Sequence, residues 1–177
     1  MQTLGGFQDY VEIDIEGNPT HRINLEIQDR LPFSDAAFHT VLCLDGLEHL
    51  ETIHAITEEM FRISKQSVIV SLPNPVAEIF RWGKTLLKEN NAPTKFYGLP
   101  LVKPRDRHKW FFSNSEAESF LIHFAEKYNF CLKFKEAIFP KARRQMGMAS
   151  LFKILSGPIP IFSFFFAQSM IFQFEKR

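Results

Sequence analysis

The stretch that decides the fold covers residues 31–74 and reads LPFSDAAFHTVLCLDGLEHLETIHAITEEMFRISKQSVIVSLPN. Its first apolar run, residues 41–44, is continuous, which is typical of a strand buried on both faces. Between residues 51 and 64 isoleucine and methionine recur at spacings of three and four, which predicts a helix. A second apolar run follows at residues 68–70. Two buried strands joined by a helix form a βαβ unit, so the sequence predicts an α/β fold with parallel strands.

Four short motifs are spread through this unit. They are Leu31-Pro32-Phe33 with Asp35 and Phe38, then Asp45, then Leu47-Glu48-His49-Leu50, and finally Ser71-Leu72-Pro73-Asn74. Together they resemble the class I S-adenosylmethionine-dependent methyltransferases, and within these the methyltransferase type 11 group. The resemblance covers residues 9–130 and implies a Rossmann-like sheet in the order 3-2-1-4-5-7-6. Such a sheet is mostly parallel, with an antiparallel carboxyl-terminal strand.

The resemblance also implies where S-adenosylmethionine would bind, because ligands of open α/β sheets lie beyond the carboxyl ends of the strands. Asp14 would accept two hydrogen bonds from the ribose diol, since an ionised carboxylate has two acceptor oxygens. The alternative is that Asp14 only caps a turn. Glu26 would lie near the adenine, with Asp29 as a competitor. The remaining expected pocket residues are Ile15 and Leu25 beside the adenine, and Leu44 and Asp45 beside the methionine part of the cofactor.

Three residues are candidates for contact with a substrate. His49 would take a proton from the nucleophile, because an imidazole titrates near neutral pH; the simpler interpretation is that it packs at the start of a helix. His108 and Trp110 would contact the substrate, although Trp110 would equally serve to anchor its loop. The expected substrate is a small molecule or an anionic group, and the positive charge of that loop favours the anionic one. Methyl transfer itself depends mainly on alignment of the nucleophile with the methyl group.

Further elements follow from local patterns along the chain. Short strands are expected at residues 9–15 and 23–25, too close together for a helix between them. A helix is expected at 76–88, and a long loop at 90–112 that acts as a lid. Ser113 and Glu116 fit a capping box for a helix ending near Tyr128. Later strands are expected at 130–138 and 169–174.

The amino-terminal region departs from the resemblance. Relatives begin with a strand and a glycine-rich turn, whereas here only Leu4-Gly5-Gly6-Phe7 precedes the strand of Asp14. We therefore expect the first strand and first helix to be missing or truncated. The strands of Asp14 and Leu44 would then pair directly, or a partner chain would fill the gap, or the product would be unstable. The alternative function is a noncatalytic remnant that acts as an interaction module.

Composition sets broader limits. The 177 residues fit a single domain, residues 1–177, and the net charge of +1 gives no reason to expect nucleic-acid binding. Residues 1–60 hold twelve acidic and two basic side chains, whereas residues 81–110 hold two acidic and eight basic ones. This asymmetry either orients a charged ligand or reflects two solvated faces.

Two distant cysteines favour a reducing cytoplasm. The six histidines show no metal-ligand spacing, so no metal is expected.

The carboxyl-terminal segment, residues 150–177, is strongly apolar. Within it, residues 154–174 carry no charged side chain, a length that would span a bilayer. Glycine, two prolines and three serines interrupt the run, so a loop that leads into a core strand explains it better than a membrane segment. Its phenylalanines would otherwise form an exposed patch for a partner or lipid surface.

Overall fold

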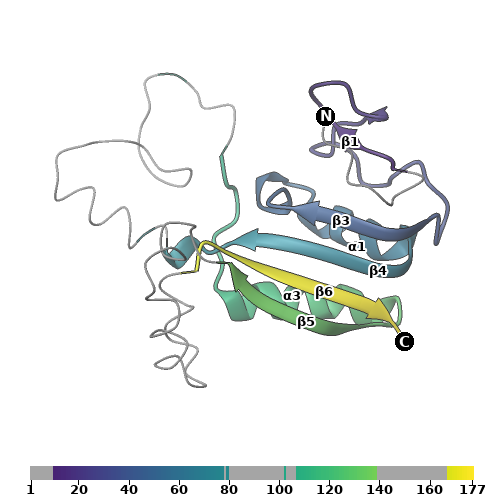
Figure 1. The fold of residues 1–177 in the computed structure, drawn as a ribbon. Helices are drawn as coiled ribbons and strands as arrows, with labels where there is room; N and C mark the ends of the chain where they lie inside the picture. The colour runs from purple at the N-terminus through teal and green to yellow at the C-terminus, as the bar shows by residue number, and fades with distance from the viewer. Residues whose placement is uncertain (1–9, 78, 80–101, 103–106, 139–166) are drawn as a thin grey trace.

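The computed structural model describes residues 10–77, 79, 102, 107–138 and 167–177. A four-stranded sheet lies at its centre, with helices behind it (Figure 1). The elements in chain order are β1 (Ile13–Asp14), β2 (His21–Arg22), β3 (Phe38–Leu44), the 3-10 helix η1 (Leu47–His49), α1 (Ile53–Ile63), β4 (Ser64–Pro73), α3 (Asn114–Lys127), β5 (Phe130–Ile138) and β6 (Ser169–Lys176).

The central sheet has the strand order β3-β4-β6-β5. Strands β3 and β4 are parallel and are joined through α1, which confirms the predicted βαβ unit. Strand β6 runs antiparallel to both of its neighbours, β4 and β5. This arrangement is the 4-5-7-6 half of the expected order, with the antiparallel strand coming last in the chain. The fold class is therefore α/β and Rossmann-like, and the carboxyl ends of β3, β4 and β5 share one edge.

Strands β1 and β2 form a separate parallel pair. The predicted strand at 23–25 is wrong, because pairing with β1 occurs two residues earlier, at His21–Arg22. Residues 15–20 between them contain no helix, as their short length required. In the described part of the chain β1 does not pair with β3, so direct pairing of these strands, one of the alternatives considered, is not found. Side chains connect the two units instead: the Phe33 ring lies 5.3 Å from His21 and 4.9 Å from Phe38.

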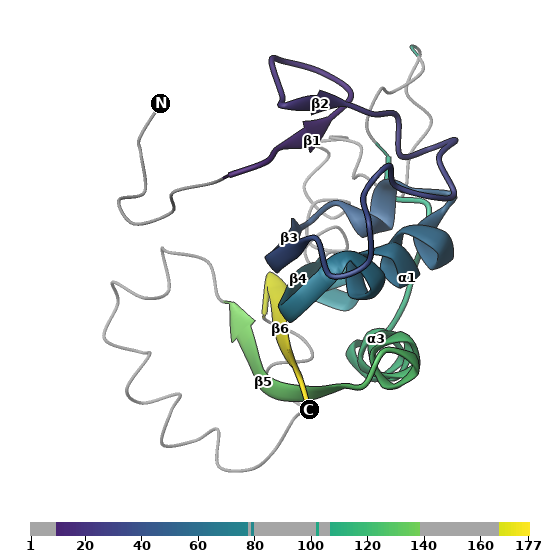
Figure 2. The same ribbon diagram turned by 90° about the vertical axis from the view of Figure 1, so that its right-hand side faces the viewer.

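One face of the central sheet packs against α1 and α3 (Figure 2). The pairing of β4 with β6 places Val68 beside Phe174, Val70 beside Phe172 and Leu72 beside Met170. All six side chains are buried. The helices contribute residues at three- and four-residue spacings, as an amphipathic helix does. They are Ile53, Ile56, Met60 and Ile63 from α1 and Ala117, Leu121, Phe124 and Ala125 from α3.

The opposite face of β3 is open in the described structure. Residues 41–44 were predicted to be buried on both faces, and this is wrong: Leu42 is 55% exposed and Leu44 is 60% exposed. Val41 and Cys43 pack against the core, because alternate residues of a strand point to opposite faces. None of the described helices contacts the face that carries Leu42 and Leu44. The strand is also at the edge of the sheet, so it lacks the second neighbour that a central strand has.

The later elements agree with the sequence pattern. Helix α3 begins with the predicted capping box: Ser113 Oγ accepts from the Glu116 N–H at 3.2 Å, and the Glu116 carboxylate accepts from the Ser113 N–H at 2.7 Å. Strand β5 occupies the predicted range, and β6 begins where predicted but extends two residues further, to Lys176. Residues 75–77 and 79 are helical, but most of the predicted helix at 76–88 and of the lid at 90–112 lies outside the described residues.

The apolar carboxyl-terminal segment is described only from residue 167 onward, where Ala167 is buried and β6 follows. Residues 154–166 of the uncharged run lie outside the described part. Across the residues that are described, no helix combines the length and hydropathy needed to cross a membrane.

Candidate functional site

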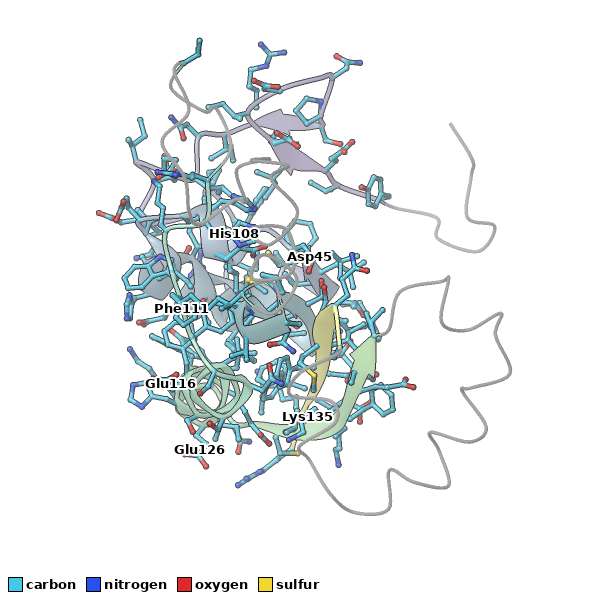
Figure 3. The ribbon with its side chains drawn as sticks, turned by 90° about the vertical axis from the view of Figure 1, so that its left-hand side faces the viewer. Asp45, His108, Phe111, Glu116, Glu126 and Lys135 are labelled. Atoms are coloured by element: carbon cyan, nitrogen blue, oxygen red, sulfur yellow. The ribbon has the colours of Figure 1, made fainter. Side chains whose placement is uncertain are left out.

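The site begins where β3 ends. Asp45 follows Leu44 directly and has a φ of 49°, in the left-handed region that aspartate and asparagine tolerate better than most residues. Ser71 of β4 holds it from two sides. The Asp45 N–H lies 3.1 Å from the Ser71 carbonyl oxygen and 3.0 Å from Ser71 Oγ, and the Ser71 hydroxyl donates to Asp45 Oδ1 at 2.8 Å. Asp45 is nevertheless exposed, so its carboxylate remains accessible at the carboxyl edge of the sheet (Figure 3).

Gly46, the next residue of this turn, lies close to the side chain of Cys43. A Cβ atom at position 46 would lie 3.4 Å from Cys43 Sγ, so glycine keeps the sulfur uncrowded. Burial of the thiol, followed by the nearby carboxylate of Glu48, raises the pKa of Cys43 to about 12. The thiol is therefore protonated at neutral pH. This favours a packing role for Cys43 over that of a nucleophile.

The left-handed turn yields a first prediction. Asp45→Val should lower the free energy of unfolding by about 2 kcal/mol, because a β-branched residue is strained at this φ. Asp45→Asn should cost less than about 1 kcal/mol, because asparagine tolerates the conformation and its side-chain oxygen still accepts from Ser71. Urea unfolding of both variants measures the difference. Equal losses would show that the backbone at this position is not under conformational constraint.

Three side chains with metal-binding donor atoms meet just beyond Asp45. Glu48 and His49 belong to η1, and His108 comes from a segment sixty residues further along. Glu48 Oε1 lies 3.5 Å from His49 Nε2 and 3.9 Å from His108 Nε2. The two imidazole rings are 4.6 Å apart in an edge-on arrangement. The side chains of Glu48 and His108 are only 1% and 3% exposed, so this is a buried group.

The segment after His108 fixes its position against η1. The Lys109 N–H donates to the Glu48 carbonyl oxygen at 2.9 Å. Trp110 Nε1 donates to the Leu50 carbonyl oxygen at 2.7 Å, and its ring lies 5.6 Å from His54 of α1. Trp110 therefore anchors this segment to the core, which is one of the two roles expected for it.

Glu26 and Lys109 form an ion pair at the rim of the site. Lys109 Nζ lies 2.5 Å from Glu26 Oε2, and the Glu51 N–H also donates to that oxygen at 3.3 Å. Burial raises the pKa of the Glu26 carboxyl, but the hydrogen bonds from Lys109 and Glu51 outweigh burial and leave it lowered. Glu26 is thus ionised at neutral pH and already paired. An adenine near Glu26 would have to compete with Lys109.

The residues expected around the ribose and adenine lie on or just after the small β1–β2 unit. Asp14 is exposed, and its Oδ1 accepts from the Glu16 N–H at 3.0 Å, as in a turn-capping aspartate. Ile15 is 52% exposed. Leu25 is half-buried against the core, and its carbonyl oxygen accepts from the Thr52 hydroxyl. The structure therefore ties Leu25 and Glu26 to the start of α1, whereas Asp14 and Ile15 face solvent.

Sequence reasoning missed two residues of this site. Ser71 was recognised only as part of a motif, although it fixes the Asp45 turn. Glu48 stood beside the candidate His49 but was not itself considered, and spacing alone gave no reason to combine it with His108. An acidic residue next to a histidine after a strand was the available signal. The meeting with His108 depends on tertiary structure.

Comparison with known proteins gives similarities of fold. No protein-family model and no curated protein sequence matches the chain. Magnesium protoporphyrin IX methyltransferase from Synechocystis, solved with bound SAH, is 16% identical with a TM-score of 0.42 over 78% of this chain. The small RNA methyltransferase HEN1 is 17% identical with a TM-score of 0.49 over 81%. An S-adenosylmethionine-dependent methyltransferase from Mesorhizobium loti is 12% identical with a TM-score of 0.49 over 88%.

The chain spans only part of these proteins: 45% of the Synechocystis enzyme, 14% of HEN1 and 68% of the Mesorhizobium loti enzyme. Several of the similar structures are S-adenosylmethionine-dependent methyltransferases. That is the class of protein that the motifs in residues 31–74 resemble.

Proposed function

We propose that this chain is an S-adenosylmethionine-dependent methyltransferase of unknown substrate, and that its four-stranded sheet contributes the Asp45 side of the cofactor site. One observation carries the proposal. The sheet order β3-β4-β6-β5, with β6 antiparallel, is the second half of the order that the sequence motifs imply. Asp45 then lies at the carboxyl end of the strand where such a sheet binds its ligand.

The residues at the end of β3 fit the methionine part of the cofactor. Asp45 offers an exposed carboxylate whose backbone is fixed by Ser71, and a carboxylate suits the charged amino group of a methionine. Leu44 beside it is 60% exposed, so it is available to cover an apolar part of a ligand. The sulfonium of the bound cofactor supplies an activated methyl group. The chain needs only to position it and to exclude water.

On the other side of the cofactor site we propose contacts from residues on or just after the β1–β2 unit. Asp14 keeps an exposed carboxylate at the end of β1, which suits a ribose diol. Ile15 is exposed and so is available to an adenine, whereas Leu25 and Glu26 are engaged with α1 and Lys109. His49 lies against Glu48 and His108, so we propose it as a residue near the acceptor rather than as the sole base.

Calorimetry with S-adenosylhomocysteine tests the proposal directly. We expect one equivalent to bind with micromolar affinity. Asp45→Asn should weaken binding at least ~10-fold, because it removes the charge that pairs with the ligand while retaining the turn. Glu126→Gln is the matched control, since Glu126 is an exposed carboxylate of α3 at a distance from the β3 end (Figure 3). It should leave the affinity unchanged.

The same titration decides between the two functions considered. A folded chain that gives no heat at high protein concentration contradicts cofactor binding and supports the noncatalytic interaction module. The observation that favours this alternative is the exposed apolar pair Leu42 and Leu44 on an edge strand, since exposed edges and apolar patches mark sites of association.

A further inference from the structure

We propose that Glu48, His49 and His108 bind one divalent transition-metal ion of the Zn²⁺ type. Each residue offers one ligand atom, and these atoms all lie within 4.8 Å of one another. The proposal goes beyond the methyltransferase assignment and does not depend on it, because metal binding and S-adenosylhomocysteine binding are measured separately. It also revises the expectation from sequence spacing, which gave no metal site.

The donor set is one that suits this class of ion. Two imidazole nitrogens and one carboxylate oxygen are the protein ligands of many catalytic zinc sites, where a fourth position stays open. The same set binds Fe²⁺ in other proteins, whereas Mg²⁺ and Ca²⁺ prefer oxygen ligands alone. A site with two histidines therefore favours Zn²⁺ or Co²⁺ over Mg²⁺.

The distances are close to those of an assembled site. Ligand atoms about 2.0–2.1 Å from a tetrahedral ion lie roughly 3.3 Å from each other. Here the Glu48 Oε1 atom is 3.5 Å from His49 Nε2 and 3.9 Å from His108 Nε2. All three ligand atoms lie within 4.8 Å of one another, so the side chains would have to rotate inward to meet at one ion.

The backbone holds the three ligands in place before any ion arrives. Glu48 and His49 share η1, and the Lys109 N–H bonded to the Glu48 carbonyl oxygen fixes the neighbouring His108. Trp110 adds a second anchor one residue further on, through Leu50. Lys109 itself extends to Glu26 at the rim, so its ammonium group is paired away from the Glu48 carboxylate. Preorganisation of this kind lowers the cost of binding an ion.

Burial and access also agree with a metal site. Glu48 is 1% exposed and His108 is 3% exposed, so two of the three ligands are shielded from bulk water, as the ligands of a protein metal site commonly are. The His49 side chain is 21% exposed, so it marks the side from which an ion and a fourth ligand would enter. The competing interpretation is that the three side chains form a buried polar cluster that binds no metal.

Metal titration of the purified, chelator-stripped chain distinguishes the two interpretations. We expect one equivalent of Zn²⁺ to bind by calorimetry, and Co²⁺ to give the visible absorption of a tetrahedral site. Glu48→Gln and His108→Gln should each weaken binding at least ~10-fold, because each removes a ligand while conserving much of its volume. His123→Gln is the matched control: His123 is an exposed histidine of α3, and its replacement should change nothing.

A second measurement uses the unaltered protein, so it does not depend on whether the variants fold. In histidine-selective NMR spectra, Zn²⁺ should shift the ring resonances of His49 and His108 and leave those of His39 and His123 in place. No binding to the stripped chain, or shifts confined to exposed histidines, would overturn the proposal. Binding that persists unchanged in both ligand variants would do the same.

Discussion

Arg62→Met should lower the free energy of unfolding by about 3–5 kcal/mol at neutral pH, because it leaves the buried Glu59 carboxylate without its cation. Arg62 Nε lies 2.6 Å from Glu59 Oε1, and Arg62 Nη2 lies 2.6 Å from Glu59 Oε2. The pair is thus bidentate, and both residues are buried near the end of α1. Chemical denaturation gives the loss.

The effect extends beyond α1 because the pair holds the chain that leads into β3. The Leu31 N–H donates to Glu59 Oε2 at 2.7 Å, and Arg62 Nη1 donates to Asp35 Oδ1 at 2.7 Å. The Arg62 carbonyl oxygen accepts from the Ala36 N–H at 2.9 Å, at a residue whose φ is 52°. Arg62→Met keeps the two backbone donors in place but removes the side-chain bonds to Asp35 and to the Leu31 carbonyl oxygen, so it loosens the loop that leads into β3.

The pH dependence has a definite sign. Burial raises the pKa of the Glu59 carboxyl, but the hydrogen bonds from Arg62 and Leu31 outweigh burial, so the pKa is lowered below its usual 4.5. The contribution of Glu59 to stability is therefore complete above about pH 4.5 and is lost as the pH falls further. In Arg62→Met burial dominates and Glu59 protonates more readily. The gap between wild type and variant should consequently shrink from about pH 7 to about pH 4.

Two further variants test the cause. Glu59→Gln combined with Arg62→Met should recover at least about 1 kcal/mol of the loss, because glutamine removes the buried charge and can still accept from the Leu31 N–H. Lys65→Met is the matched control at an exposed cation and should change stability by less than about 0.5 kcal/mol. A double variant no more stable than Arg62→Met would exclude the buried charge as the cause.

The fold could be predicted from sequence wherever local pattern and tertiary structure agree. The spacing of Ile53, Ile56, Met60 and Ile63 predicted α1, and Ser113 with Glu116 predicted the start of α3. The errors occurred where tertiary contacts decide the outcome. Leu42 and Leu44 were taken for buried residues because their run is apolar, yet burial requires a covering element that local sequence does not specify. The pairing of His21 with Ile13 likewise depends on register rather than on propensity.

Some features of the candidate site could likewise be predicted from sequence, and others depend on tertiary structure. Asp45 could be located from sequence because a strand end and a turn lie together in the chain. Two other features could not be predicted from sequence: the hydrogen bonds by which Ser71 fixes Asp45, and the contact of Glu48 with His108. They join residues that are 26 and 60 positions apart in the chain. Trp110 was given two roles, and its bond to Leu50 supports the anchoring one.

Phe174→Ala should lower the free energy of unfolding by about 3–5 kcal/mol, because it opens a cavity where three elements meet. Phe174 is fully buried in β6, pairs with Val68 of β4 and lies 5.4 Å from the Phe61 ring of α1. Strand β6 separates β4 from β5, so the cavity would weaken the contact of the sheet with α1. Thermal and chemical denaturation measure the loss.

Gln173→Ala provides the matched control in the same strand. Gln173 pairs with Ile69 and faces the opposite side of the sheet, where no described helix packs, so the change should stay within about 0.5 kcal/mol. If Phe174→Ala does not fold, Phe174→Leu keeps most of the apolar volume and should lose less than about 1.5 kcal/mol. Comparable losses for Gln173→Ala and Phe174→Ala would mean that the core does not lie on the α1 face. The Val68–Phe174 pairing that places β6 between β4 and β5 would then need revision, and with it the strand order that supports the proposed function.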